Sequence, residues 1–373
     1  ALILRRQGAD TEARQAIAEA QRLRPGILAD PPLGWQNMVF ANGHLYTRAE
    51  SEIWDVDLSA ANPVETRIVG QTPATSVYDF KMGPCAQASL TQIRGLAALP
   101  DGSLVAADMW ANAVVKISNP SNASTCTVTS LAGQPGPLTG LDPDRVETLP
   151  PEGNDDGVGA AASFRQVSAL ATTSDGTIYV VDKSVTNGDT LVRKIDSSGR
   201  VTKLVDLATD VGNIEVIRNF TVMGGKLYAA GGDSSNHGYV VQIDTGTGAL
   251  TKVIGGDASA FDPVSSGSDP SVSGITNDGS HLIIAGAGYV WFLGLDGKLT
   301  LAAGTGRNID NFPSGYDPKV SHPALSLALP TVIGSSDDFG TGSLNHITYF
   351  NGALYFRGHA NGTAAFIEKI ACP

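Results

Sequence analysis

The sequence predicts an all-β fold, a six-bladed β-propeller of four-stranded antiparallel blades with a short N-terminal helix. Two observations support this prediction: a two-residue turn followed by a short apolar strand recurs six times, and the last copy stops one strand early. Asn-Gly, Asp-Gly and Gly-Gly accept positive φ at both centres of a type I′ hairpin. The six turns are Asn42-Gly43, Asp101-Gly102, Asp175-Gly176, Gly224-Gly225, Asp278-Gly279 and Asn351-Gly352. Six copies of one hairpin indicate six copies of one unit, arranged as a ring.

The composition fits a large, turn-rich β protein. The chain has 373 residues, of which 42% are hydrophobic, only 17% are charged and 43 are glycine. A ring of blades forms a long single domain, so this length does not require several domains. The net charge is −12. Because no basic stripe exists to neutralise phosphates, nucleic acid is excluded as a partner class.

The ends of the chain and its hydropathy suggest where the protein works. No run of 18 apolar residues is present, so no transmembrane helix is expected. The chain begins at Ala1 and shows no signal peptide. We interpret it as a mature or trimmed form and expect an extracellular or periplasmic location.

Residues 1–30 differ from the rest of the chain. Apolar positions from 11 to 24 fall on one helical face, and Pro25-Gly26 ends the pattern. Residues 1–6 are apolar enough to form a strand. We therefore divide the chain into a strand and helix segment, 1–30, which packs on or precedes the ring, and a six-bladed propeller, 31–373.

From Trp35 onward each of the first five copies has four expected strands: one before the turn, one after it and two more. The expected strands of the first three copies are 38–41, 45–47, 52–57 and 66–69; 96–98, 103–107, 113–117 and 127–131; and 167–172, 177–181, 190–195 and 201–205. Those of the last three are 220–223, 226–230, 238–243 and 250–254; 274–276, 281–285, 290–293 and 299–302; and 346–350, 354–357 and 364–370. The sixth copy lacks a fourth strand, and an unpaired edge is a liability. We expect residues 1–6 to pair with 364–370 and complete the last blade.

The second and third copies resemble NHL repeats. The second has Gly95-Leu96-Ala97, Asp101-Gly102, Ala107-Asp108, Val114-Val115-Lys116-Ile117 and Ser130-Leu131-Ala132-Gly133. The third has Asp175-Gly176, Val181-Asp182 and Leu191-Val192-Arg193-Lys194-Ile195, and the segments 156–164 and 323–330 resemble the links of the family. The resemblance covers residues 35–373 and implies an NHL-type propeller. The family includes lyases that use metals as well as many binding and scaffold modules, so the fold alone does not decide function.

The lengths of the connections favour one face of the ring as the binding face. The turn between the first two strands is minimal in every copy, whereas the long segments, 70–91, 132–163, 255–272 and 303–343, all belong to the opposite face. Connections of this kind commonly carry function. The alternative is neutral insertion.

Polar residues precede the first strand of each copy and should ring the channel mouth on that face. The ligand-binding candidates are Asn37, Arg94, Arg218, Asn219, Asn345 and His346. Guanidinium and amide groups of this kind can hold a carboxylate or phosphate through charge-assisted hydrogen bonds. In the alternative interpretation these groups bond to neighbouring blades or to water.

Metal ligation is the weaker hypothesis. Asp108, Asp182 and Asp233 lie at or just past the end of the second strand, where Asp more commonly caps loop backbone. His237 and His359 lie in the following loops, and no two histidines have a ligand-type spacing. No cofactor is certain from the sequence; calcium fits loop carboxylates and carbonyls better than zinc fits these histidines.

The three cysteines, Cys85, Cys126 and Cys372, allow at most one intramolecular disulfide. Cys85 precedes the second repeat and Cys126 lies late in it, so these two could meet. The alternative is three buried thiols.

Taken together, these observations favour a secreted or periplasmic binding or scaffold module without catalysis. We expect its partner, a protein or a small anionic ligand, on the face with the long connections. The alternative is a metal-dependent lyase or hydrolase acting at the channel mouth on the same face.

Overall fold

The computed structural model describes residues 35–49, 51–58, 64–70, 80–136, 150–207, 216–232, 238–255, 272–286, 289–304, 347–359 and 365–371. The helix expected at 11–24 and the strand expected at 1–6 lie outside these residues. In the part of the chain that is described, the elements are strands and two short 3₁₀ helices. No helix there has the length and hydropathy needed to cross a bilayer.

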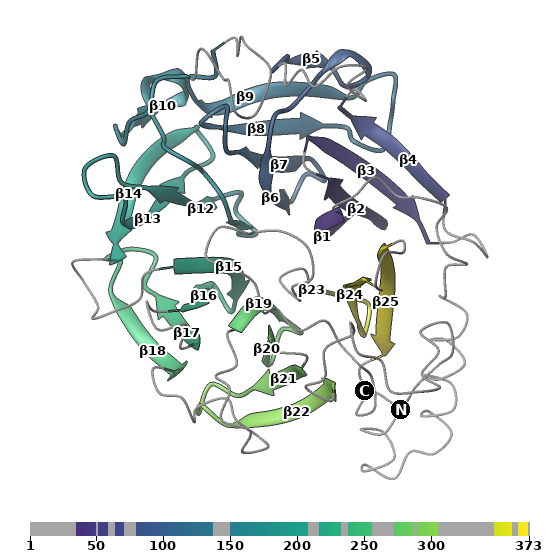
Figure 1. Ribbon diagram of the computed structural model, residues 1–373, viewed down its shortest axis with the longest axis vertical. Helices are drawn as coiled ribbons and strands as arrows, with labels where there is room; N and C mark the ends of the chain where they lie inside the picture. Colours follow the sequence, from purple (N-terminus) through teal and green to yellow (C-terminus); the bar gives the residue numbers. More distant parts are fainter. Residues whose placement is uncertain are drawn as a thin grey trace.

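Six antiparallel sheets stand around a central axis, and each sheet is one blade (Figure 1). Blade 1 contains β1 (Trp35–Ala41), β2 (His44–Ala49), β3 (Glu52–Asp57) and β4 (Val64–Val69). Blade 2 contains β5 (Gly83–Pro84), β6 (Ile93–Ala98), β7 (Leu104–Asp108), β8 (Ala113–Ser118) and β9 (Thr127–Gly133). Blade 3 contains β10 (Gly157–Val158), β11 (Leu170–Thr172), β12 (Ile178–Lys183), β13 (Thr190–Ile195) and β14 (Arg200–Asp206).

In the remaining blades the strands follow one another in chain order from the axis outward. Blade 4 contains β15 (Val216–Met223), β16 (Lys226–Gly232), β17 (Gly238–Ile243) and β18 (Leu250–Gly255). Blade 5 contains β19 (Val272–Asn277), β20 (Leu282–Gly286), β21 (Tyr289–Leu293) and β22 (Leu299–Gly304). Blade 6 contains β23 (Ile347–Phe350), β24 (Ala353–His359) and β25 (Ala365–Ala371).

The innermost strands form a closed ring. Each of β1, β6, β11, β15, β19 and β23 contacts the corresponding strand of the next blade, and β23 contacts β1. This confirms the six-bladed propeller. All innermost strands run the same way along the axis, so they begin at one face of the ring, which we call the entry face. The hairpins to the second strands lie at the other face, the turn face. Pairing of residues 1–6 with the last blade falls outside the described residues and stays a prediction.

Aromatic packing joins the last blade to the first. The ring of Phe40 stacks on that of Phe350, with centroids 4.1 Å apart and planes inclined by 7°. Tyr355 packs against Phe40 at 4.9 Å. Met38 and Leu45 of blade 1 belong to the same apolar cluster as Tyr355. The seam between the ends of the described ring is therefore hydrophobic.

The middle of each blade is buried on both faces because a neighbouring blade covers each side. All five residues of β7, Leu-Val-Ala-Ala-Asp, are buried, and so are the five of β20. Such strands read as continuous apolar runs and do not alternate between apolar and polar residues, since neither face meets water.

The turns divide into two kinds, which corrects the prediction of six type I′ hairpins. At Asn42-Gly43, Gly224-Gly225 and Asn351-Gly352 both centres have positive φ, as a type I′ turn requires. In the Asp-Gly turns only the glycine, Gly102, Gly176 or Gly279, has positive φ. The reason is the aspartate side chain: Asp101 Oδ1, for example, accepts a hydrogen bond from the Ser103 backbone N–H at 2.9 Å. This local bond holds a wider turn.

Short links fasten the outer edges of blades 2 and 3 to the blades before them. Strand β5 pairs with β9, and β10 pairs with β14. A 3₁₀ helix follows each, η1 (Cys85–Gln87) and η2 (Gly159–Ala161). Helix η1 contacts β4 of blade 1, and η2 contacts β9 of blade 2. Each link therefore bridges two blades at the rim.

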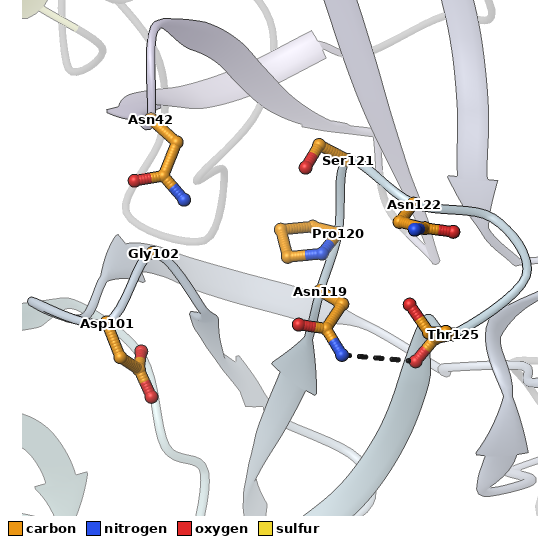
Figure 2. A pocket seen from close by; sticks show the side chains of 8 residues that line it. All are labelled: Asn42, Asp101, Gly102, Asn119, Pro120, Ser121, Asn122 and Thr125. Atoms are coloured by element: carbon orange, nitrogen blue, oxygen red, sulfur yellow. Dashed lines mark hydrogen bonds between the residues drawn. The ribbon is translucent and has the colours of Figure 1, made fainter.

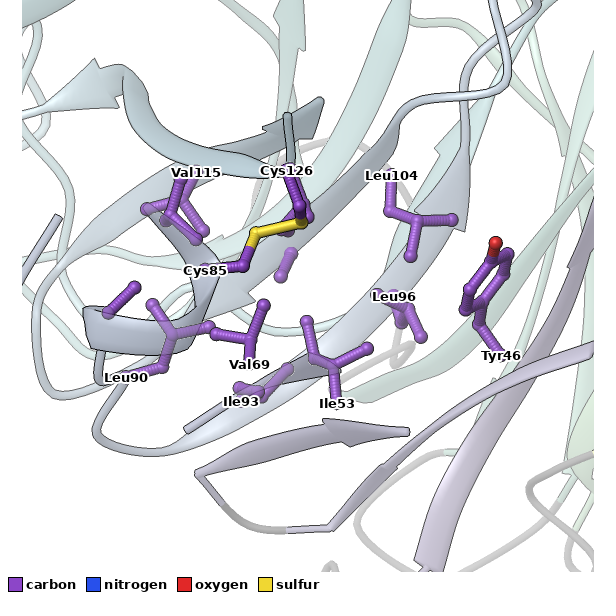
Figure 3. Packing of buried hydrophobic residues seen from close by; sticks show 14 of the residues in the cluster. Tyr46, Ile53, Val69, Cys85, Leu90, Ile93, Leu96, Leu104, Val115 and Cys126 are labelled. Atoms are coloured by element: carbon purple, nitrogen blue, oxygen red, sulfur yellow. A yellow bond between two sulfur atoms is a disulfide. The ribbon is translucent and has the colours of Figure 1, made fainter. Parts of the chain in front are cut away.

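A disulfide joins Cys85 to Cys126, with the Cα atoms 5.3 Å apart, and confirms the pairing that the sequence left open. Both cysteines are buried. They lie in an apolar cluster between blades 1 and 2 that includes Val69, Leu90 and Ile93 (Figure 3). The bond thus ties the link of blade 2 to the end of the loop that leads into β9.

Replacing both cysteines by serine should lower the free energy of unfolding by about 2–4 kcal/mol, because the bond restricts the unfolded chain. Denaturant unfolding with and without dithiothreitol checks this. Reductant should lower the midpoint of the native protein to that of Cys85→Ser/Cys126→Ser and leave the variant unchanged. Equal stability of the native protein and the serine variant in the absence of dithiothreitol would contradict the prediction.

Glu65 on β4 carries a desolvated carboxylate. Its Oε1 is buried and has no hydrogen-bond partner among the described residues. Burial raises the pKa of Glu65 to about 7. The folded protein therefore binds a proton at this carboxyl at pH values where the unfolded chain has already released it.

The contribution of Glu65 to stability should be fully present below pH about 4.5 and be lost as the pH rises through about 7. Glu65→Gln removes this dependence. Urea unfolding should find the variant similar to the native protein at pH 5 and more stable at pH 8, by about 1–2 kcal/mol once solvent screening is allowed for. A difference that stays constant between these pH values would contradict the assignment.

Candidate functional site

Four innermost strands have, near their start at the entry face, one residue more than the second strand with which they pair. The pairing of β1 with β2, β6 with β7, β15 with β16 and β19 with β20 shifts at this point. The extra residues are Asn37, Arg94, Arg218 and Ser273. The sequence placed these polar residues before the strands, and the structure corrects this: they are β-bulges inside strands that begin earlier. Bulges re-aim a side chain and are common beside functional sites.

Asn37 ties two blades together. Its backbone is left-handed, with φ 61°. Its Oδ1 accepts a hydrogen bond from the Leu96 N–H in blade 2, at 3.0 Å. Asn112 makes the same kind of bond from blade 2 to the Gln166 N–H at the start of blade 3, at 2.9 Å. For Asn37 the structure thus supports the alternative interpretation, bonding to the neighbouring blade.

Arg218 shows no bond of this kind to a neighbouring blade among the described residues. Burial lowers the pKa of its guanidinium. Its Nε is buried and has no hydrogen-bond acceptor among the described residues. The next residue, Asn219, accepts a hydrogen bond from the Phe220 N–H at 2.8 Å. Arg218 is therefore a partly buried positive group on an innermost strand.

Arg94 occupies the same bulge position in blade 2 that Arg218 occupies in blade 4. Its Nε is also buried. Both strands face the axis of the ring (Figure 1). The structure thus puts two of the predicted ligand-binding arginines at equivalent places on the entry face. The other two candidates, Asn345 and His346, lie outside the described residues.

Asp108 caps loop backbone at the end of β7. The carboxylate is fully buried. It accepts hydrogen bonds from the N–H groups of Thr91 at 2.7 Å, Gln92 at 3.2 Å and Ala111 at 3.2 Å, and from the Thr91 hydroxyl. Burial raises the pKa of Asp108, while these donors oppose the shift. Since its oxygens are engaged by backbone donors, the capping interpretation holds.

Asp182 at the equivalent place in blade 3 combines capping with a buried ion pair. It accepts hydrogen bonds from the Arg165 N–H at 2.8 Å and from Asn154 Nδ2 at 3.0 Å. Arg193, also fully buried, donates to it from Nη1 at 3.1 Å. Burial raises the pKa of Asp182 to about 6, against the lowering effect of these partners. The carboxylate of Asp182 is therefore both paired with a charge and hydrogen-bonded within the protein.

Arg193 also holds the link of blade 3. Its Nη2 donates to the Asp155 carbonyl at 3.0 Å and to Asp156 Oδ1 at 2.9 Å. Its guanidinium lies over the Phe164 ring, 5.3 Å from the centroid. Only the family pattern Arg-Lys-Ile pointed to this residue in the sequence, and nothing there indicated its buried role.

The other metal candidates are not brought together by the described structure. Asp233 and His237 lie outside the described residues, as does the side chain of His359. Across the described ranges, no three His, Cys, Asp or Glu side chains form a group suited to a metal ion.

A polar cleft opens on the turn face, opposite the entry face (Figure 2). It has a volume of about 190 Å³ and lies between the Asn42 turn, the Asp101-Gly102 turn and the loop from Asn119 to Thr125. This site could not be predicted from the sequence, because its three segments are far apart in the chain. The one available signal was the density of Asn, Ser and Thr in the segment 119–125.

Comparisons with known proteins identify the fold. No family model matches the sequence, and no curated protein matches it. A putative gluconolactonase of known structure is 11% identical to this chain, covers 95% of it and 96% of its own length, and gives a TM-score of 0.51. A gluconolactonase from Xanthomonas campestris is 11% identical over 94% of this chain and 92% of its own, with a TM-score of 0.51.

The PQQ-bound aldose sugar dehydrogenase from Streptomyces coelicolor is 12% identical over 93% of this chain and 97% of its own, again with a TM-score of 0.51. At these identities the likeness shows the propeller fold and nothing about activity.

Breaking the buried pair should be more harmful than removing both charges. Arg193→Met leaves Asp182 ionised and unpaired in the core, and should lower the free energy of unfolding by about 3–5 kcal/mol. Arg193→Met/Asp182→Asn removes that charge and should recover part of the loss. Urea unfolding at pH 7.5 measures these two variants and the single variant Asp182→Asn. If the losses of the two single substitutions simply add in the double variant, the pair is not coupled.

Proposed function

We propose that this protein is a secreted or periplasmic propeller that binds an anionic group, on a small molecule or a protein, at the entry face. The observation that carries this proposal is Arg218, a partly buried guanidinium whose Nε is buried and lacks an acceptor among the described residues. The protein has no catalytic step in this proposal.

Physical chemistry favours an anion at this place. Taking a guanidinium out of water is costly unless an opposite charge and hydrogen bonds compensate it. Carboxylate and phosphate match the planar donor geometry of arginine. The whole chain has a net charge of −12, which disfavours anion binding over most of its surface. A positive group on an innermost strand therefore directs an anion to this place. Arg94 at the equivalent bulge supplies a second guanidinium on the same face.

The proposed location rests on the disulfide. Bonds such as Cys85–Cys126 form and persist in oxidising compartments and are rare in the cytosol. The bond is buried in the core between two blades, which suits a permanent structural role.

The blades are proposed to be NHL-type repeats. In support, the segment that resembles the family link forms strand β10 and helix η2 and packs Phe164 into the core between blades 2 and 3. A metal-dependent lyase or hydrolase acting at the same face is the competing hypothesis. Elemental analysis of purified protein distinguishes the two: stoichiometric zinc with histidine ligands would favour the enzyme.

Calorimetric titration with inorganic phosphate and with citrate tests the anion site. Arg218→Ala should weaken binding of the preferred probe about tenfold or more, the size of a charge-assisted hydrogen bond. Arg200→Ala removes an exposed charge on the outer strand β14 and should leave affinity unchanged. Raising the ionic strength should weaken binding in the native protein.

Three outcomes decide the proposal. Loss of affinity with an unchanged melting temperature supports it. Unfolding of both Arg218→Ala and Arg218→Lys would show that the arginine only joins blades together. Equal affinity of the native protein and Arg218→Ala, or no binding of either probe, would also overturn it.

A further inference from the structure

We propose a second binding site, the cleft on the turn face between blades 1 and 2, which takes a neutral hydroxylated ligand the size of one sugar ring. Its lining residues come from two blades and are polar apart from Gly102 and Pro120. This site is independent of the proposed anion site, which lies on the other face.

The cleft is formed by three turns that are held in place. Asp101 Oδ1 fixes its own turn through the Ser103 N–H. Asn119 Nδ2 donates to the Thr125 carbonyl at 3.4 Å (Figure 2). Asn122 Oδ1 accepts from the Ser124 N–H at 3.1 Å. The loop then continues directly into the disulfide at Cys126. A site fixed in this way loses little conformational entropy on binding.

The side chains around the opening both donate and accept hydrogen bonds. Asn42 projects its carboxamide from the blade 1 turn toward Gly102 and Pro120 (Figure 2). The Ser121 side chain lies on the opposite side of the opening, near the Tyr46 hydroxyl. Carboxamides and hydroxyls match alcohol groups, because each alcohol both donates and accepts. The chemistry therefore suits a ligand with several hydroxyls.

Charge argues against an ionic ligand. Asp101 contributes the sole carboxylate among the lining residues, and Lys116 Nζ pairs with it at 2.8 Å. The described residues that line the cleft include no lysine, arginine or histidine, and the nearby Lys116 is already paired with Asp101, so an anion finds no counter-charge of its own. Calcium prefers six to eight oxygens with several carboxylates. A neutral ligand meets neither problem.

The size of the cleft limits the ligand. Drug-sized molecules occupy pockets of about 300–1,000 Å³. At about 190 Å³ this cleft holds a smaller body, such as a single pyranose or the terminal unit of a chain.

The chain offers a matched pair of variants. Asn42→Gly removes the carboxamide and keeps the positive φ of 50° that the turn requires. The resulting Gly-Gly turn already occurs in blade 4, at Gly224-Gly225. Asn351→Gly makes the same change in the type I′ turn of blade 6, away from the cleft.

Saturation-transfer NMR titrations with the methyl glycosides of glucose, galactose and mannose test the proposal. At least one should bind the native protein and Asn351→Gly saturably, with a Kd of roughly 1–10 mM, as a few hydrogen bonds allow. Asn42→Gly should weaken it at least about fivefold, the effect of one hydrogen bond. Arg218→Ala should not change it.

No saturable binding by any of the three glycosides would overturn the proposal. So would equal affinity in Asn42→Gly and Asn351→Gly, since binding would then lie elsewhere. Calcium chloride or sodium phosphate can be titrated while the NMR signals of the protein itself are followed. Neither should change the signals of the cleft residues. A response to either that is lost in Asn42→Gly would assign the cleft to an ion instead.

Discussion

Each blade packs between two neighbouring blades, and this two-sided packing is the constraint on which the rest of the structure depends. Close to the axis the blades approach most tightly: a Cβ atom at Gly95 of blade 2 would collide with the carbonyl oxygen of Ser168 in blade 3. Polar groups caught there cannot reach water and need partners within the ring. Asn37, Asn112 and Asp108 supply such partners, which is why these residues serve the architecture. Arg218 differs from them, because its buried Nε has no acceptor among the described residues.

At the rim of the ring the blades diverge, so neighbouring blades need additional contacts to hold them together there. Blades 2 and 3 solve it with the same backbone, a short edge strand followed by a 3₁₀ turn, but with different chemistry. Cys85 stands at the first position of η1 where Gly159 stands in η2, and it anchors its link covalently. Blade 3 instead anchors its link to the buried guanidinium of Arg193. The first solution requires an oxidising environment, whereas the second does not.

Most of the fold could be predicted from sequence because turn chemistry is local. Asn42-Gly43 and Asn351-Gly352 specify their hairpins within two residues, and the runs after them specify strands. The Asp-Gly turns were predicted with the wrong geometry, since the pair of residues does not reveal that Asp101 will bond to the Ser103 N–H. The bulges at Arg94 and Arg218 were also missed: one extra residue changes the pairing with the next strand and leaves no trace in hydrophobic periodicity.

The candidate sites could be predicted only in part, because they depend on distant segments. The sequence marked Arg94 and Arg218 by their repeated position, but gave no measure of how far Arg218 would be desolvated. The cleft was invisible because Asn42, Asp101 and Asn119 come from separate turns that meet only when blades 1 and 2 pack. For the same reason the sequence could suggest that Cys85 and Cys126 meet and could not decide it.

The stacked rings of Phe40 and Phe350 have a consequence for how the protein is made. Their strands come from opposite ends of the described chain, so a ribosome releases the first long before the second exists. Blades 2 to 5 can dock in order as they emerge. The apolar flank of blade 1 that packs against blade 6 has no blade 6 to cover it until synthesis is nearly complete. Because non-local contacts of this kind form late and slowly, the growing chain carries an adhesive surface throughout synthesis. Escape from aggregation during that interval, more than the strength of the finished ring, should limit the yield of correctly folded protein.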